Sequence, residues 1–292
     1  MKDSSEEKRM IRFGIMQGRL TPSNGRGIQF FPFEFWKEEF HIGQRIGIQE
    51  IEWIFDYPNY NENPIWSAEG QEEISKKIEK TGIVVKTVCW DYFMRRPFYK
   101  QSGTARMEWF TENKRILEQV LAGMEKIGAE LIEIPLVDDS SIQTDNEREE
   151  AIRFIRWACD LAAGKGMKVG LETDFPVGVF VDFLNEIGCG NVKANYDSGN
   201  SSGLGYDAKD ELESLGEYVY NVHIKDRLKG NGTMKLGTGS ADFDKVFGTL
   251  KKIGYGNSFI MQAARGEDGE ESKEVAGQLS FVKEYLKKYN MK

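Results

Sequence analysis

The sequence is poor in cysteine and histidine and contains no long apolar run. Its 292 residues include three cysteines, Cys89, Cys159 and Cys189, which are widely spaced and form no CxxC pair. This pattern argues against a disulfide framework and a cysteine zinc site, and it fits a reducing, cytoplasmic compartment. No segment approaches the roughly 18 apolar residues of a membrane span, and the charged residues 1–10 lack the apolar stretch of a signal peptide. We therefore expect no membrane partner, a flexible extension over residues 1–10 and a single domain over residues 11–292.

Binding of nucleic acid or of a nucleotide is also disfavoured. Acidic side chains outnumber basic ones by 47 to 39, and the net charge of -8 repels a phosphate backbone. Neither GxGxxG nor GxxxxGK followed by Ser or Thr occurs after the first expected strand, so the common nucleotide-phosphate loops are missing. A small molecule is the expected partner, and the sequence leaves homo-oligomer formation open.

Short apolar, β-branched segments alternate with longer amphipathic segments along the chain. Eight strands are expected at Ile11–Met16, Ile48–Ile54, Ile83–Val88, Glu130–Pro135, Lys168–Thr173, Val192–Tyr196, Tyr218–Lys225 and Ser258–Met261. The helices are expected at Phe35–Ile46, Ala68–Lys80, Arg106–Ile127, Asp145–Lys165, Val177–Ile187, Asp207–Leu215, Phe243–Ile253 and Glu271–Tyr289. Eight strand–helix units in 292 residues favour a closed (β/α)8 (TIM) barrel of the α/β class, with an open doubly wound sheet as the alternative.

Local signals support the expected helices. Thr144 followed by Glu147 has the spacing of a capping box at the start of the fourth helix. Glycine follows several expected helices just before the next strand, as at Gly128 and Gly188. Glycine can adopt the left-handed conformation that ends a helix at little energetic cost.

Three expected strands end in side chains that can bind a metal. Glu172 lies at the end of the fifth strand, Asp197 at the end of the sixth and His223 near the end of the seventh. The C-terminal strand ends of a barrel meet at one mouth, so these side chains are expected to converge. Two carboxylates and an imidazole suit one divalent ion, namely Mn²⁺, Zn²⁺, Co²⁺ or Mg²⁺. The alternative is that they are polar residues of the barrel mouth, paired with lysine and arginine.

Short motifs in this order make the sequence similar to a known family. They are Phe13-Gly14-Ile15-Met16-Gln17-Gly18-Arg19-Leu20, Gly170-Leu171-Glu172, Tyr196-Asp197-Ser198-Gly199-Asn200, Val222-His223-Ile224-Lys225-Asp226 and Gly237-Thr238-Gly239. The chain resembles the xylose isomerase-like sugar phosphate isomerases and epimerases, whose superfamily includes tagatose 3-epimerases and endonuclease IV. The resemblance implies that strands five to eight supply Glu, Asp, His and Glu to one divalent metal. The first three ligands carry over to Glu172, Asp197 and His223.

The fourth ligand position departs from the family pattern. Gln262 stands where the family has glutamate, and its carbonyl oxygen can bind a metal but cannot act as a general base. With Glu172 as the remaining base, the resemblance implies a metal-dependent sugar or sugar-phosphate isomerase that transfers a proton through an enediol. Lys225, on the strand face of His223, is expected to stabilise the enediolate or to serve as a base. Two alternatives stay open: an epimerase whose second base is another residue, and a catalytically idle barrel that binds a sugar or polyol.

Further residues near the strand ends are candidates for holding the sugar. Glu52 is expected to bond hydroxyl groups, and Trp90 is expected to form an apolar wall. Arg227 and Arg265 are candidates for holding a phosphate or carboxylate. Asn200 is neutral at a position where some epimerases of the superfamily have histidine. A structural role is the alternative for each of these residues. The chain has only two histidines, too few for the trinuclear zinc cluster of endonuclease IV, so DNA repair is disfavoured.

Overall fold

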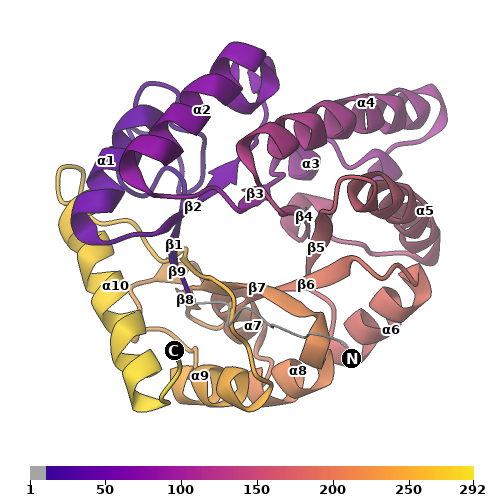
Figure 1. Ribbon diagram of the computed structural model, residues 1–292. Helices are drawn as coiled ribbons and strands as arrows, with labels where there is room; N and C mark the ends of the chain where they lie inside the picture. Colours follow the sequence, from indigo (N-terminus) through magenta and orange to yellow (C-terminus); the bar gives the residue numbers. More distant parts are fainter. Residues whose placement is uncertain (1–10) are drawn as a thin grey trace, which may run out of the picture.

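A closed barrel of parallel strands forms the centre of the molecule (Figure 1). The structure is a computed structural model that describes residues 11–292, so the extension expected for residues 1–10 lies outside the described residues. The barrel strands are β1 (Phe13–Met16), β2 (Glu50–Ile54), β3 (Thr87–Cys89), β4 (Leu131–Leu136), β5 (Lys168–Thr173), β6 (Val192–Asp197), β7 (Val219–Ile224) and β10 (Phe259–Met261). They are arranged around the barrel in chain order, and β10 pairs with β1 to close it. The predicted (β/α)8 barrel is confirmed.

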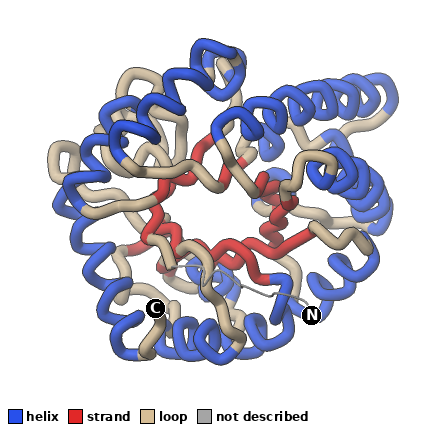
Figure 2. Tube along the Cα trace, viewed as in Figure 1, coloured by secondary structure: helices blue, strands red, loops and turns tan. Residues whose placement is uncertain are grey.

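Helices follow the barrel strands and form an outer ring around them (Figure 2). They are α1 (Trp36–Ile46), α2 (Ala68–Thr81), α3 (Tyr92–Arg95), α4 (Gly103–Ile127), α5 (Asp145–Ala163), α6 (Val177–Ile187), α7 (Ser198–Leu204), α8 (Ala208–Leu215), α9 (Phe243–Lys252) and α10 (Glu271–Lys288). A short antiparallel pair, β8 (Asp226–Arg227) and β9 (Thr233–Met234), lies between β7 and α9. Within residues 11–292, no helix has the length and apolar character needed to cross a membrane.

The predicted helix ends are largely present. The Thr144 hydroxyl accepts a hydrogen bond from the Glu147 backbone N–H at 3.3 Å and caps α5. The Glu147 carboxylate accepts from the backbone N–H of Gln143, at 2.7 Å, so the return bond of the capping box is displaced by one residue. Gly128 and Gly188 end α4 and α6 in the left-handed conformation, with φ of 76° and 69°.

The third strand begins later than the sequence predicts. An apolar run suggests Ile83–Val88, but β3 covers Thr87–Cys89, and within the earlier part Val84 forms an isolated bridge to Glu50. Ile83 and Val85 are nevertheless buried. Because apolar side chains can be buried without a continuous strand ladder, the run alone placed the strand too early.

The interior of the barrel is polar. Its buried inward-facing side chains include Glu50, Glu52, Thr87, Glu133, Asn195, Asn221 and His223. Glu52 of β2 accepts a hydrogen bond of 2.7 Å from Asn221 of β7, a strand that does not pair with β2, so the two side chains meet inside the barrel. Apolar side chains of the strands and helices supply the stabilising core, at about 1.5–3 kcal/mol for each fully buried large one. Buried carboxylates oppose folding unless they are paired, so the polar interior points to a functional role.

Candidate active site

A cavity of about 420 Å³ opens at the C-terminal ends of the barrel strands. Its lining includes Gln29 after β1, Asp56 after β2, Asp91 after β3, Glu172 of β5 and Gln262 after β10. Segments from around the barrel therefore converge on one space. Barrel enzymes hold their active sites at this end of the strands, so the cavity is the candidate active site.

His223 lies at the centre of a buried cluster beneath the cavity, and neither His223 nor Asp197 is among the residues that line the cavity. Its Nε2 is 2.7 Å from an oxygen of Glu52, and its Nδ1 is 3.6 Å from Glu172 Oε2 and 3.8 Å from Asp197 Oδ2. Burial lowers the pKa of His223, but the carboxylates of Glu52 and Glu133 outweigh it and hold that pKa well above the usual value.

Asp197 is held in place by backbone groups. Its Oδ1 accepts the N–H groups of Gly199 and Asn200, each at 2.8 Å, and so caps α7. Its Oδ2 is 3.3 Å from the Lys225 ammonium. Burial acts to raise the pKa of Asp197, but Lys225 and His223 outweigh this and lower it to about 2. Asp197 is thus a fixed anion at neutral pH.

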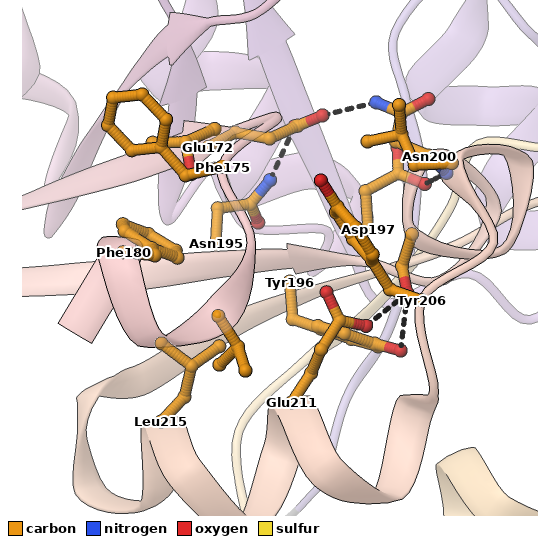
Figure 3. Close-up of a pocket in the computed structure, with 14 residues that line it drawn as sticks. Glu172, Phe175, Phe180, Asn195, Tyr196, Asp197, Asn200, Tyr206, Glu211 and Leu215 are labelled. Carbon is orange, nitrogen blue, oxygen red and sulfur yellow. Dashed lines mark hydrogen bonds between the residues drawn. The ribbon is translucent and has the colours of Figure 1, made fainter.

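Glu172 has the opposite protonation tendency. It accepts hydrogen bonds from the side-chain amides of Asn195, at 2.9 Å, and of Asn200 (Figure 3). Burial, followed by the neighbouring Asp197, raises the pKa of Glu172. A carboxylate of raised proton affinity beside one that stays ionised is the pairing expected of proton-transfer chemistry.

Lys225 reaches the cavity past a glycine. A Cβ at position 199 would lie 2.6 Å from Lys225 Cγ, closer than side-chain contacts allow. The Lys225 backbone is held by Ser198, whose hydroxyl donates to the Lys225 carbonyl at 2.7 Å. The sequence Asp197-Ser198-Gly199 therefore places both the Lys225 ammonium and its anionic partner.

The donor set fits a divalent ion. Donor atoms of Glu133, Glu172 and His223 all lie within 4.8 Å of one another. Two donors bonded at about 2.1 Å to one tetrahedral ion stand roughly 3.4 Å apart, close to the 3.6 and 3.8 Å that separate His223 Nδ1 from Glu172 and Asp197. The Gln262 Oε1 atom is buried and has no hydrogen-bond partner, so its lone pairs are available to a cation. Carboxylate, imidazole and amide oxygens suit Mn²⁺, Zn²⁺, Co²⁺ or Mg²⁺.

Two predicted substrate-binding residues, Glu52 and Trp90, do not line the cavity. Glu52 is fully buried below His223 and does not line the cavity. Trp90 is also fully buried, stacked on Phe154 with ring centroids 6.0 Å apart, and is absent from the cavity wall. Of the expected set, Asn200 and Lys225 do line the cavity, as do Glu172 and Gln262.

The two predicted anion-binding arginines are bonded within the protein. Arg227 donates to the Asn200 side-chain carbonyl at 2.9 Å and to the Asn231 backbone carbonyl at 3.1 Å. Arg265 donates to the backbone carbonyls of Gly18 and Thr21. Neither lines the cavity, so their contacts fit the structural alternative.

Some residues of the site were missed by sequence reasoning. Glu133 joins the metal-competent cluster, and Gln29, Cys89 and Asp91 line the cavity. Asp91 had a usable signal, because it is a carboxylate that follows a strand end, as Glu172 and Asp197 do. Gln29 had none, since it lies in an irregular loop without periodicity.

Comparison with known proteins identifies the family. Residues 40–285 match the family model described as xylose isomerase-like TIM barrel, and the chain belongs to this family, as its motifs predicted. L-ribulose-5-phosphate 3-epimerase of Escherichia coli (strain SMS-3-5) is 22% identical over 272 residues, which cover 88% of this chain and 92% of that protein.

Solved structures share the fold at low sequence identity. D-psicose 3-epimerase from Clostridium cellulolyticum H10, solved with D-tagatose, gives a TM-score of 0.73 at 15% identity and covers 94% of this chain and 99% of its own. The IolI protein, solved with a zinc atom, also gives a TM-score of 0.73 at 15% identity and covers 96% of this chain and 99% of its own.

Proposed function

We propose that the protein is a divalent-metal-dependent sugar epimerase that inverts the carbon next to a ketone by proton transfer. The observation that carries the proposal is the arrangement of His223, with Nε2 on Glu52 and Nδ1 facing Glu172 and Asp197 beneath an open cavity. A metal-binding histidine commonly donates its other ring N–H to a carboxylate in this way. The names of the relatives support epimerisation over the aldose–ketose isomerisation suggested by Gln262 alone.

The contacts of each residue indicate its role in the proposed reaction. Glu172, Asp197, His223 and the Gln262 carbonyl oxygen would hold the ion, which would polarise the ketone and acidify the neighbouring C–H bond. Glu172 borders the cavity, so its carboxylate is placed to remove or return that proton. The Lys225 ammonium also lines the cavity and can donate a hydrogen bond to the enediolate oxygen.

The cavity favours an unphosphorylated sugar. Six carboxylates line it, from Asp56, Asp91, Glu133, Asp138, Asp139 and Glu172. Its two basic side chains are already paired, Arg95 with Asp139 at 2.7 Å and Lys225 with Asp197 at 3.3 Å. A phosphate dianion there would meet these carboxylates with no unpaired basic side chain in the lining to bind it, whereas hydroxyl groups could donate to the carboxylates. This separates the proposal from the phosphorylated substrate in the name of the Escherichia coli relative.

The proposal is tested by epimer formation from a ketose panel. Protein stripped with a chelator is incubated with D-fructose, D-allulose, D-tagatose or L-ribulose, with and without added Mn²⁺, Co²⁺ or Zn²⁺, and products are resolved by chromatography. We expect an epimer of at least one ketose only when metal is present, and no epimer with a His223→Ala variant. Aldose formation would support the isomerase alternative. Ketose binding with no product under any metal would support the idle binding barrel.

A further inference from the structure

Epimerisation needs two proton-transfer groups, and this chain has lost the expected second one. Inverting a carbon requires one group to remove the proton from one face and another to deliver a proton to the opposite face. Glu172 can serve one face, but the amide of Gln262 cannot take up a proton. If the protein is the epimerase proposed above, another residue of the site must supply this second group.

A chain of hydrogen bonds leads from Gln262 to a carboxylate. The Gln262 side-chain amide donates to Gln29 Oε1 at 2.8 Å, and the Gln29 amide donates to Asp91 Oδ2 at 2.7 Å. The other Asp91 oxygen accepts from the Cys89 thiol at 3.2 Å. All four side chains line the same cavity. Asp91 is therefore one amide away from the position of the missing glutamate.

The barrel topology places the Gln262–Gln29 end of this series of hydrogen bonds across the cavity from Glu172. In the closed strand order, β1 lies four strands from β5 in both directions, so the two are diametrically opposed. Gln29 follows β1, Gln262 follows β10 beside it, and Glu172 belongs to β5. Asp91 follows β3, two strands from both β5 and β1, and its hydrogen bond with Gln29 joins its carboxylate to the loop that follows β1. A sugar held between these walls would have Glu172 on one side and Asp91 on the other.

The other carboxylates of the cavity fit this role less well. Glu133 stands on β4, which pairs with the β5 strand of Glu172, and a side-chain hydrogen bond joins the two carboxyl groups, so they serve the same side. Asp138 and Asp139 are exposed. Asp56 is partly buried, and its Oδ2 accepts the backbone N–H of Phe31 at 3.0 Å. Asp91 is the cavity carboxylate that hydrogen bonds connect, through Gln29, to Gln262.

We propose that Asp91 is the second proton-transfer group of the site and takes the place of the glutamate that Gln262 replaces. In one direction Glu172 takes the proton as the substrate C–H bond breaks, leaving an enediolate, and the protonated Asp91 carboxyl then gives its proton to the opposite face as the new C–H bond forms. In the other direction the roles exchange, and solvent restores both protonation states between turnovers. No oxidant or reductant is required.

The surroundings of Asp91 suit proton transfer. Burial raises the pKa of Asp91 and so strengthens it as a base. Burial, followed by Asp91 itself, raises the pKa of the Cys89 thiol far above its usual value, so Cys89 stays neutral and remains a donor. Donors from Cys89 and Gln29 fix the orientation of the carboxylate.

Stereospecific hydrogen exchange tests the proposal. The metal-loaded protein is incubated in D₂O with D-fructose and, separately, with its C3 epimer D-allulose, and both deuterium incorporation and epimer formation are followed by NMR. For Asp91→Asn we expect epimer formation to fall about 100-fold or more. One of the two epimers should still exchange its C3 hydrogen within about tenfold of the wild-type rate, because Glu172 alone can remove and return a proton on its own face.

Matched variants make the result specific. Asp56→Asn alters another carboxylate of the same cavity and should keep the wild-type ratio of epimer formation to exchange. Asp91→Asn combined with Gln262→Glu should recover epimer formation by about tenfold or more over Asp91→Asn alone. Metal content and melting temperature, measured on every variant, should match the wild type for Asp91→Asn, since Asp91 is placed outside the ligand set.

Three outcomes with the variants would overturn the proposal, and one with the wild type would overturn the epimerase function as well. Asp91→Asn could keep the wild-type ratio of epimer formation to exchange, or it could abolish exchange of both epimers while retaining metal and fold. Asp56→Asn could instead produce the one-sided exchange expected of Asp91→Asn. Wild-type protein that exchanges no hydrogen and forms no epimer with any ketose and metal would contradict the epimerase function itself, and the role of Asp91 with it.

Discussion

The Glu52→Gln substitution is expected to weaken metal binding although Glu52 does not face the proposed ion. Glu52 accepts hydrogen bonds from His223 Nε2 at 2.7 Å, Thr87 Oγ1 at 2.6 Å and Asn221 Nδ2 at 2.7 Å. Glutamine offers one carbonyl oxygen, and its NH₂ group would confront at least one of these donors. The His223 ring would lose the charged partner that orients it. Loss of such a partner typically lowers metal affinity 10- to 100-fold, which corresponds to about 1.4–2.8 kcal/mol.

The assay is competition with a fluorescent zinc chelator at fixed pH, compared between wild type, Glu52→Gln and Glu50→Gln. Glu50 is a matched control because it is a buried glutamate on the same strand and no contact joins it to His223. We expect Glu50→Gln to bind zinc with wild-type affinity and Glu52→Gln to bind 10- to 100-fold more weakly. Equal affinities for all three proteins would refute the role of Glu52 in orienting His223.

Four further results are expected. Burial raises the pKa of Glu50 to about 7, so the wild type loses stability as the pH rises from about 4.5 to 7. Because glutamine does not titrate, Glu50→Gln avoids this loss. Its free energy of unfolding in urea should therefore rise, relative to that of the wild type, by up to about 3 kcal/mol between pH 5 and pH 8. Gly199→Ala should lower the unfolding free energy by about 1–3 kcal/mol because its methyl group would overlap Lys225, whereas Gly178→Ala, which adds its methyl group to open space, should cost nothing in a thermal melt. A ketose should be turned over with at least about tenfold higher kcat/KM than its phosphate ester, because phosphate meets like charge in the cavity; equal values would contradict the preference. Gln262→Glu should retain the metal in elemental analysis, and loss of metal would refute Gln262 as a ligand position.

The barrel could be predicted from the sequence because its elements are periodic. Alternating strand and helix patterns gave eight units, and the strand-end positions of Glu172, Asp197 and His223 brought them near one another in the structure. The same patterns could not predict how deeply each side chain is buried in the barrel. Glu52 lies near its strand end in sequence, yet its side chain contacts the buried Nε2 of His223. Strand alternation gives the face of a side chain but not its partner across the barrel.

The contacts of loop residues could not be predicted from the sequence. Arg265 follows a strand end, which suggested anion binding, but the loop after β1 folds over it and supplies backbone carbonyls as partners. Gln29 and Asp91 belong to irregular segments, and their contact joins positions 62 residues apart in the sequence. Such pairings arise from tertiary structure, and no local pattern encodes them.

Metal content tests the central claim most directly. Elemental analysis of the purified protein, before and after reconstitution with Mn²⁺, Co²⁺ or Zn²⁺, should be compared with a His223→Ala variant treated identically. The account predicts about one divalent ion per wild-type chain and its loss in the variant, because the imidazole is the donor that faces both Glu172 and Asp197. A wild-type protein that takes up none of the three metals, or a variant that binds them equally well, would contradict it.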